Sequence, residues 1–242
     1  MRSFFLLSVL AVPVLVSSGL AEPVAAPIPE TEIVNRYVSA TQEQQTTLRG
    51  ASMEVDIDAE IPKLNKRGKL HALRKMSSLG KITYRMLGFN GDNTVKNQVI
   101  ARYLSAEVQA QDGPSLSITP ANYKFKYKGT VQGQSRKLYA LRVTPRKKKL
   151  GLFSGELWLD AETFMPVRES GRLVKSPSVF LKNVQFVEYY AIENGVAVPQ
   201  RLESRVETRI FGPVKLSINY AGFSKQADEA VEEATFVDDA AQ

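Results

Sequence analysis

Hydrophobic and polar residues alternate along the stretch from Val198 to Ile210. The residues that alternate with the hydrophobic positions form a stripe of alternating charge: Arg201, Glu203, Arg205, Glu207 and Arg209. Successive side chains of a strand point to opposite faces, so this pattern predicts a strand with one buried and one charged face. The same period of two occurs in residues 53–61, 123–128 and 137–144, which predicts further strands there.

Residues 151–199 predict three consecutive strands, over 156–160, 165–175 and 180–192, joined by short turns. Asn194 and Gly195 then predict a two-residue hairpin turn, because both residues tolerate the positive φ that such a turn requires. Strands joined in this way form an antiparallel meander.

Two segments instead show a helical period. One begins near Thr31, a candidate cap, and ends near Arg49 and Gly50. The other is capped by residues 91–93 (Gly-Asp-Asn) and carries one apolar stripe: Val95, Val99, Ile100, Tyr103, Leu104 and Val108. About ten strands and two helices predict an α+β fold in which a strongly curved antiparallel sheet wraps around the helices.

Three runs carry a family resemblance: FSGELWLDAETFMPVR at 153–168, NVQFVEY at 183–189 and NGVAVPQRL at 194–202. They resemble the LolA-like family of periplasmic lipoprotein carriers over roughly residues 123–223. The resemblance implies an unclosed half-barrel of about 10–11 strands that binds or shuttles lipid or acylated lipoprotein cargo without catalysis or a cofactor. It also implies an envelope membrane protein as donor or acceptor. The same fold resembles the N-terminal domain of an envelope-stress regulator, so a sensor is the alternative.

The N-terminus has the pattern of a secretory signal, with Arg2, an apolar run from Phe4 to Val16 and small residues up to Ala21. We expect cleavage after Ala21 and export to the periplasm. The chain has no cysteine, which excludes disulfides and lipid attachment at a cysteine. The remaining chain divides into a flexible lead (22–29), one domain (30–224) and an acidic disordered tail (225–242). We expect a monomer.

Charge is distributed unevenly: residues 22–224 carry 30 Lys and Arg against 19 Asp and Glu, whereas residues 225–242 carry one Lys against six acids. The loop run Arg146, Lys147, Lys148 and Lys149 could contact an anionic membrane surface or lipid head groups. Nucleic acid is not expected, because the lysines and aromatics of residues 123–128 alternate and therefore occupy opposite faces of a strand.

Candidate catalytic chemistry is sparse. His71 is the sole histidine, and no nucleophile motif or second histidine accompanies it. The carboxylates of residues 54–60 recur on one strand face, which favours pairing with a basic neighbouring strand over metal binding. Asp160 and Glu162 are the acids considered for a hydrolase, the least favoured function, but acids are ordinary at a turn.

The inward positions of the predicted strands define a candidate cavity for an apolar ligand. Its expected lining is mostly aliphatic and aromatic: Phe125, Tyr139, Leu157, Leu159, Val167, Phe186, Leu202, Val206, Leu216 and Ile218. Such a set suits either a ligand cavity under a movable helix or a filled core. The two alternatives differ in whether these side chains have permanent packing partners.

Overall fold

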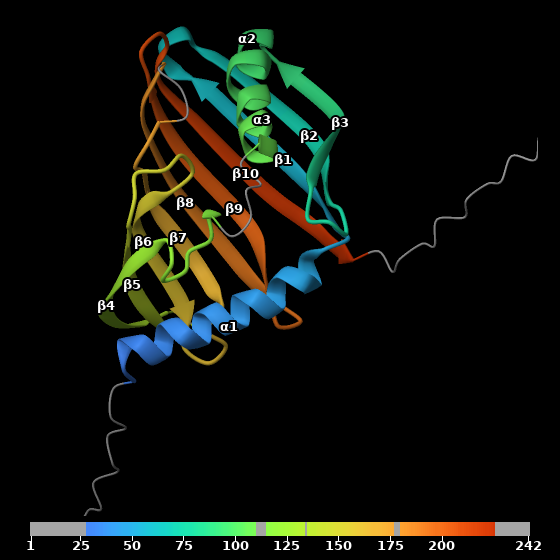
Figure 1. Ribbon diagram of the computed structural model, residues 1–242. Helices are drawn as coiled ribbons and strands as arrows, with labels where there is room; N and C mark the ends of the chain where they lie inside the picture. The colour runs from blue at the N-terminus through green and yellow to red at the C-terminus, as the bar shows by residue number, and fades with distance from the viewer. Residues whose placement is uncertain (1–27, 110–114, 134, 177–179, 226–242) are drawn as a thin grey trace, which may run out of the picture.

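The computed structural model describes residues 28–109, 115–133, 135–176 and 180–225. In these residues ten strands form one antiparallel sheet in the order β3-β2-β1-β10-β9-β8-β7-β6-β5-β4, with β3 and β4 at its unpaired edges (Figure 1). Their bounds are β1 (Ala51–Ile61), β2 (Lys66–Met76), β3 (Ile82–Gly91), β4 (Tyr123–Gln132), β5 (Lys137–Pro145), β6 (Phe153–Asp160), β7 (Pro166–Leu173), β8 (Leu181–Glu193), β9 (Val196–Thr208) and β10 (Gly212–Lys225). The predicted α+β class and the unclosed half-barrel are confirmed.

The hairpin turns follow the local chemistry of their residues. Asn194 and Gly195 join β8 to β9 with φ values of 51° and 78°, as the sequence predicts for a two-residue turn. A short helix, η1 (Pro62–Leu64), joins β1 to β2, and Asn65 ends it in the left-handed conformation at φ 51°. The sheet order departs from chain order because β1 pairs with β10, so that the first and last strands lie side by side.

Helix α1 (Glu30–Leu48) crosses one end of the half-barrel (Figure 1). Thr31 is not its cap. The N-cap is Pro29, two residues earlier, and the first-turn acids Glu30 and Glu32 interact favourably with the positive end of the helix dipole. Its buried residues Ile33, Val34 and Tyr37 face the sheet.

The second helical segment comprises α2 (Asn93–Val95), a π-helical turn η2 (Lys96–Ile100) and α3 (Ala101–Gln109). The Asp92 side chain accepts a hydrogen bond from the Thr94 N–H at 2.7 Å, which confirms the cap predicted at this position. Figure 1 shows this segment on the same face of the sheet as α1, which we call the inner face. Among the described residues, no helix is both long and apolar enough to cross a membrane.

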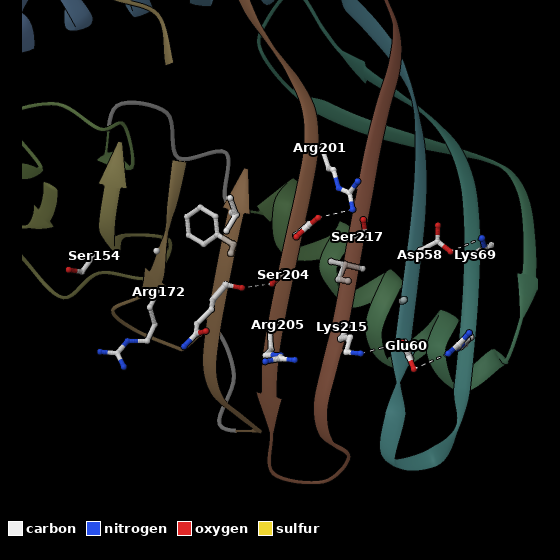
Figure 2. A pocket seen from close by; sticks show the side chains of 18 residues that line it. Asp58, Glu60, Lys69, Ser154, Arg172, Arg201, Ser204, Arg205, Lys215 and Ser217 are labelled. Atoms are coloured by element: carbon white, nitrogen blue, oxygen red, sulfur yellow. Dashed lines mark hydrogen bonds and ion pairs between the residues drawn. The ribbon is translucent and has the colours of Figure 1, made fainter. Parts of the chain in front are cut away.

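The outer face of the sheet carries cross-strand ion pairs. Asp58 of β1 pairs with Lys69 of β2 at 3.0 Å, and Glu60 pairs with Arg67 at 3.3 Å (Figure 2). His71 Nδ1 lies 2.9 Å from Asp56 Oδ1 on the same two strands. These contacts confirm that the β1 carboxylates serve as partners of a basic neighbouring strand, and no group of potential metal ligands occurs within the described ranges.

Candidate functional site

Two apolar clusters occupy the inner face, each beneath one helix. Residues of β1, β2, β9 and β10 form the first cluster with Val95 and Ile100, which are 0% and 1% exposed. The second cluster joins α1 to β4, β5 and β6 and includes Tyr37, Leu141 and Leu157. The half-barrel therefore has two separate packed regions at its two sides rather than one central core.

Phe186 of β8 links the two clusters, because it packs against both. Its ring meets that of Phe153 edge to face, with centroids 5.0 Å apart and planes at 80°. Despite these contacts Phe186 is only half-buried, and every inner-face residue of β8 around it is also half-buried. The inner surface of β8 is therefore only partly covered by the two helices.

All of the predicted lining residues except Val167 belong to one or both of the two clusters. Phe125, Tyr139, Leu157 and Leu159 belong to the α1 cluster, and Val206, Leu202, Leu216 and Ile218 belong to the other. Leu157 and Leu159 are fully buried and Ile218 is 1% exposed, so these three have permanent packing partners. The members that remain half-buried are Phe125, Tyr139, Val167, Phe186 and Val206.

Ionisable side chains also lie on this inner surface. Glu169 of β7 and Glu188 of β8 are register partners, and their other neighbours in the sheet are the inner-face residues Leu157 and Leu202. Burial raises the pKa of Glu169 to about 8, and the nearby charge of Glu188 adds to this shift. Burial likewise raises the pKa of Glu188 to about 7, while a hydrogen bond with Tyr190 opposes the shift.

A buried ion pair attaches α3 to the sheet next to this surface. The Arg74 guanidinium of β2 donates to Glu107 Oε1 at 3.0 and 3.2 Å, and the Tyr84 hydroxyl donates to Glu107 Oε2 at 2.6 Å. Burial alone would lower the pKa of Arg74, but Glu107 outweighs it and raises that pKa. Glu107 is thus held by two strands, and the end of the helix is fixed over the sheet edge.

Helix α1 has its own polar attachment. The Gln44 side chain donates to the Ala197 carbonyl at 2.9 Å and accepts from the Ala197 N–H at 3.1 Å. At the other end of the helix, the Glu30 carboxylate accepts from the Tyr127 N–H at 2.6 Å. These contacts join α1 to β9 and β4, which lie far apart in the sheet order.

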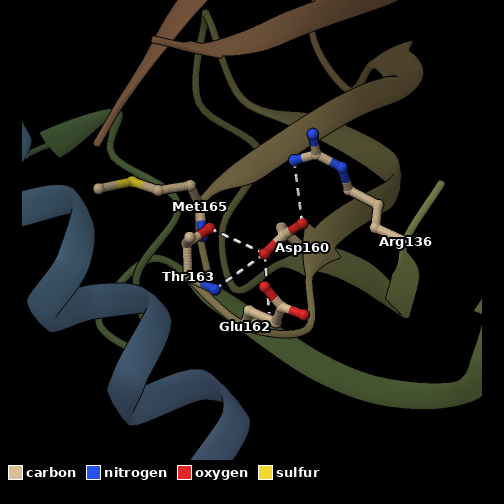
Figure 3. Close-up of polar contacts among 5 residues, drawn as sticks. All are labelled: Arg136, Asp160, Glu162, Thr163 and Met165. Atoms are coloured by element: carbon tan, nitrogen blue, oxygen red, sulfur yellow. Dashed lines mark hydrogen bonds and ion pairs between the residues drawn. The ribbon is translucent and has the colours of Figure 1, made fainter. Parts of the chain in front are cut away.

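Of the acids considered for a hydrolase, Asp160 is the last residue of β6 and Glu162 lies in the turn between β6 and β7 (Figure 3). Asp160 Oδ1 accepts from the backbone N–H groups of Glu162 and Thr163 at 3.0 and 2.8 Å, and Oδ2 accepts from Arg136 at 3.1 Å. Burial would raise the pKa of Asp160, but these hydrogen bonds outweigh it and lower the pKa. Asp160 therefore acts as an ionised cap of the turn, and both of its carboxylate oxygens accept hydrogen bonds.

The basic loop is exposed at the β5–β6 connection. Arg146 donates to the Pro120 carbonyl at 2.7 Å, and Lys149 donates to the Ser115 hydroxyl at 2.6 Å. These contacts fix both ends of the run, and the Lys147 and Lys148 side chains between them are exposed. The loop therefore presents two exposed ammonium groups on a segment whose two ends are fixed by the contacts of Arg146 and Lys149.

Inspection of the sequence missed the polar inner-face residues Glu169, Glu188, Arg74 and Glu107. A signal was present for Glu188, which shares its alternation phase with Phe186 in the predicted third strand. Glu169 lies in a segment with weak alternation, where the inward positions cannot be told from the outward ones.

The sequence matches no protein-family model, and no curated protein resembles it in sequence. Among solved structures, a LolA superfamily protein of Nitrosomonas europaea is similar over 83% of this chain and 95% of its own, with 10% identity and a TM-score of 0.40. A DUF1329 family protein of Desulfovibrio piger covers 84% of this chain and 95% of its own, with 14% identity and a TM-score of 0.44. An outer membrane lipoprotein-sorting protein domain of Vibrio parahaemolyticus covers 83% and 95%, with 12% identity and a TM-score of 0.37.

Proposed function

We propose that the protein is a non-catalytic periplasmic carrier that binds an acyl chain of a lipid or lipoprotein on the inner surface of β7 and β8. The observation that carries this proposal is the position of Phe186, which touches both apolar clusters yet stays half-buried. A chain bound there would cover apolar surface that neither helix covers. The N-terminal secretory pattern supports the compartment.

Burial of apolar surface would supply the affinity. Each acyl CH₂ removed from water contributes about 0.8 kcal/mol, so a long chain needs no directional contact to bind. Phe125, Tyr139 and Val206 are other half-buried residues of the predicted lining, and they extend the proposed surface from Phe186 toward the two clusters. Val167 is half-buried as well.

The ionisable groups of the inner surface are compatible with an apolar ligand. Because burial raises the pKa values of Glu169 and Glu188, a carboxyl group of this pair retains a proton near neutral pH. A protonated carboxyl carries no net charge, so it adds much less desolvation cost to acyl binding than a carboxylate would. It can also donate a hydrogen bond to an ester or amide carbonyl.

The decisive experiment is mass spectrometry of lipids extracted from the protein after purification under native conditions. The proposal expects a co-purifying acyl lipid and a weaker displacement signal with a fluorescent fatty acid in Phe186→Gln. Tyr189→Gln is the matched control, because Tyr189 is an exposed aromatic residue of the same strand. Equal fatty-acid affinity in the wild type, Phe186→Gln and Tyr189→Gln would refute the proposed binding surface.

We further propose that Lys147 and Lys148 contact anionic lipid head groups during loading or delivery. Each basic side chain near an anionic leaflet contributes about 1 kcal/mol to membrane binding. Vesicle flotation with phosphatidylglycerol should show less binding for Lys147→Glu/Lys148→Glu than for the wild type. Lys124→Glu/Lys126→Glu changes the same charge on β4, and an equal loss in that variant would attribute binding to net charge alone.

A further inference from the structure

A groove of about 960 Å³ lies on the outer face of the sheet, opposite the proposed acyl surface (Figure 2). It extends over β6, β7, β8, β9, β10, β1 and β2. Six basic and three acidic side chains line it: Arg67, Lys69, Arg172, Arg201, Arg205, Lys215, Asp58, Glu60 and Glu203. The groove is therefore cationic, in contrast to the inner surface.

The acids of the groove are already engaged. Asp58 pairs with Lys69, Glu60 pairs with Arg67 at 3.3 Å and lies 3.8 Å from Lys215, and Glu203 pairs with Arg201 at 2.7 Å. Arg172 and Arg205 have no acidic partner among the described residues. Both are exposed, so two guanidinium groups remain available to an outside anion.

The strand register places these two arginines on one line across the sheet. Arg172 of β7 pairs with Gln185 of β8, which in turn pairs with Arg205 of β9, and Lys215 of β10 follows. Strands lie about 4.8 Å apart, so the arginines begin about 10 Å from each other with the Gln185 amide between them. Guanidinium groups bind carboxylates through paired hydrogen bonds, which makes this line suited to an acidic peptide.

The chain itself supplies such a peptide. Residues 226–242 contain no Lys or Arg and six acids: Asp228, Glu229, Glu232, Glu233, Asp238 and Asp239. They follow directly from Lys225, the last residue of β10, a strand that also carries Lys215 in the groove. The peptide therefore begins on a strand of the groove and has the complementary charge.

The length of this segment suffices to reach the line of cations. Lys215 lies about 33 Å along β10 from Lys225, at about 3.3 Å for each residue. An extended chain from Lys225 to Asp239 spans up to about 46 Å at the same rise. Carboxylates on the distal part of the segment can therefore meet Arg205 and Lys215, and those nearer to Lys225 can meet Arg201.

We propose that the acidic C-terminal segment 226–242 binds the outer groove of its own chain, with its carboxylates on Arg172 and Arg205. The tether keeps the local concentration of these carboxylates high, so individually weak surface ion pairs suffice. The association requires no secondary structure in the segment.

The test uses the full chain and the absence of native cysteine. A spin label on Ala234→Cys is expected to broaden the amide resonances of Gln185, Arg205 and Lys215 in low salt. The broadening should disappear near 1 M salt, where the screening length is about 3 Å. It should also disappear in Arg172→Gln/Arg205→Gln, because the two unpaired cations are then absent.

Two controls decide between the alternatives. Lys124→Gln/Lys126→Gln removes two exposed cations of β4 outside the groove and should leave the broadening unchanged. Isotope-labelled protein mixed with spin-labelled, isotope-free protein should show no broadening, since the contact is within one chain. Broadening in that mixture, equal loss in the β4 control, or signals affected only next to Lys225 would overturn the proposal.

Discussion

Glu169 and Glu188 face each other across the β7–β8 pair on the inner surface of the half-barrel. Tyr190 hydrogen-bonds with these carboxyl groups. Glu107 of α3 adds to the rise in the pKa of Glu188, and Tyr37 of α1 adds to the rise in the pKa of Tyr190. Removal from water raises both pKa values, and the proximity of the two groups disfavours simultaneous ionisation. The pair therefore binds protons more tightly in the folded chain than in the unfolded chain.

The first prediction is that the free energy of unfolding falls as pH rises from about 5 to about 8. Over this range the folded chain holds protons that the unfolded chain, with ordinary glutamate pKa values, has already released. Stability therefore decreases with pH, because the folded state must lose these protons against a burial cost. Chemical denaturation at several pH values measures the slope.

Glu188→Gln and Glu169→Gln should flatten this dependence, since glutamine does not titrate. Glu43→Gln, at an exposed position of α1, is the control and should leave the slope as it is in the wild type. A stability that rises between pH 5 and 8 in the wild type, or an unchanged slope in both inner variants, would contradict the assignment.

The second prediction concerns the ion pair between Arg74 and Glu107, whose side chains are 11% and 21% exposed. Glu107→Ala should reduce the free energy of unfolding by about 3–5 kcal/mol, because it leaves a buried guanidinium unpaired. Arg74→Met/Glu107→Leu should recover much of this loss. Glu32→Gln, which removes the exposed pair with Arg36 on α1, should cost at most about 1 kcal/mol. Denaturation of the single and double variants supplies the coupling energy, and strictly additive effects would refute the pairing.

The third prediction tests the close approach of β6 and β7. A Cβ at Gly155 would lie 1.9 Å from the Ser170 carbonyl oxygen and 2.6 Å from Gly171 Cα, and neither backbone atom can move without separating the strands. Gly155→Ala should therefore destabilise the protein by about 3 kcal/mol or more. Gly88→Ala in β3 meets no atom within 4 Å and should change stability by less than about 0.5 kcal/mol. Equal melting temperatures for the two variants would contradict the observed packing of β6 on β7.

Much of the fold could be predicted because its local signals are consistent with its tertiary structure. The alternation in β9, the Asn194–Gly195 turn and the Asp92 cap each have a local physical cause that the tertiary structure preserves. The start of α1 was placed wrongly at Thr31, since a proline at the N-cap and acids in the first turn replace a hydroxyl cap. Helix boundaries depend on such competing choices, so the exact first residue is weakly determined.

The candidate site was harder to predict, because alternation identifies a face but not its neighbours. Phe186 and Leu157 both lie at inward positions, yet Leu157 is fully buried beneath α1 and Phe186 is only half-buried between the clusters. That difference depends on where the two helices cross the sheet. Residues distant in the sequence determine those crossing positions. The pairing of Arg74 with Glu107 likewise requires the packing of α3 on β2.

The last prediction concerns Asp160, whose side chain is 3% exposed beneath the β6–β7 turn. Its carboxylate accepts hydrogen bonds from the backbone of Glu162 and Thr163 and from Arg136, so Asp160→Ala leaves these donors without their acceptor. The free energy of unfolding should fall by about 1–3 kcal/mol for such a loss. Glu162→Gln, which keeps the backbone donor, is the control and should be nearly neutral.

The pH dependence of the Asp160 contribution has the opposite sign to that of the inner glutamates. Because its hydrogen bonds lower the pKa, the stabilisation is present above the ordinary aspartate pKa and is lost as pH falls through the lowered value. The difference in stability between wild type and Asp160→Ala should therefore be constant near neutral pH and shrink only in strong acid. A difference that grows on acidification would show that Asp160 carries a proton in the folded protein, and the turn-cap assignment would then be wrong.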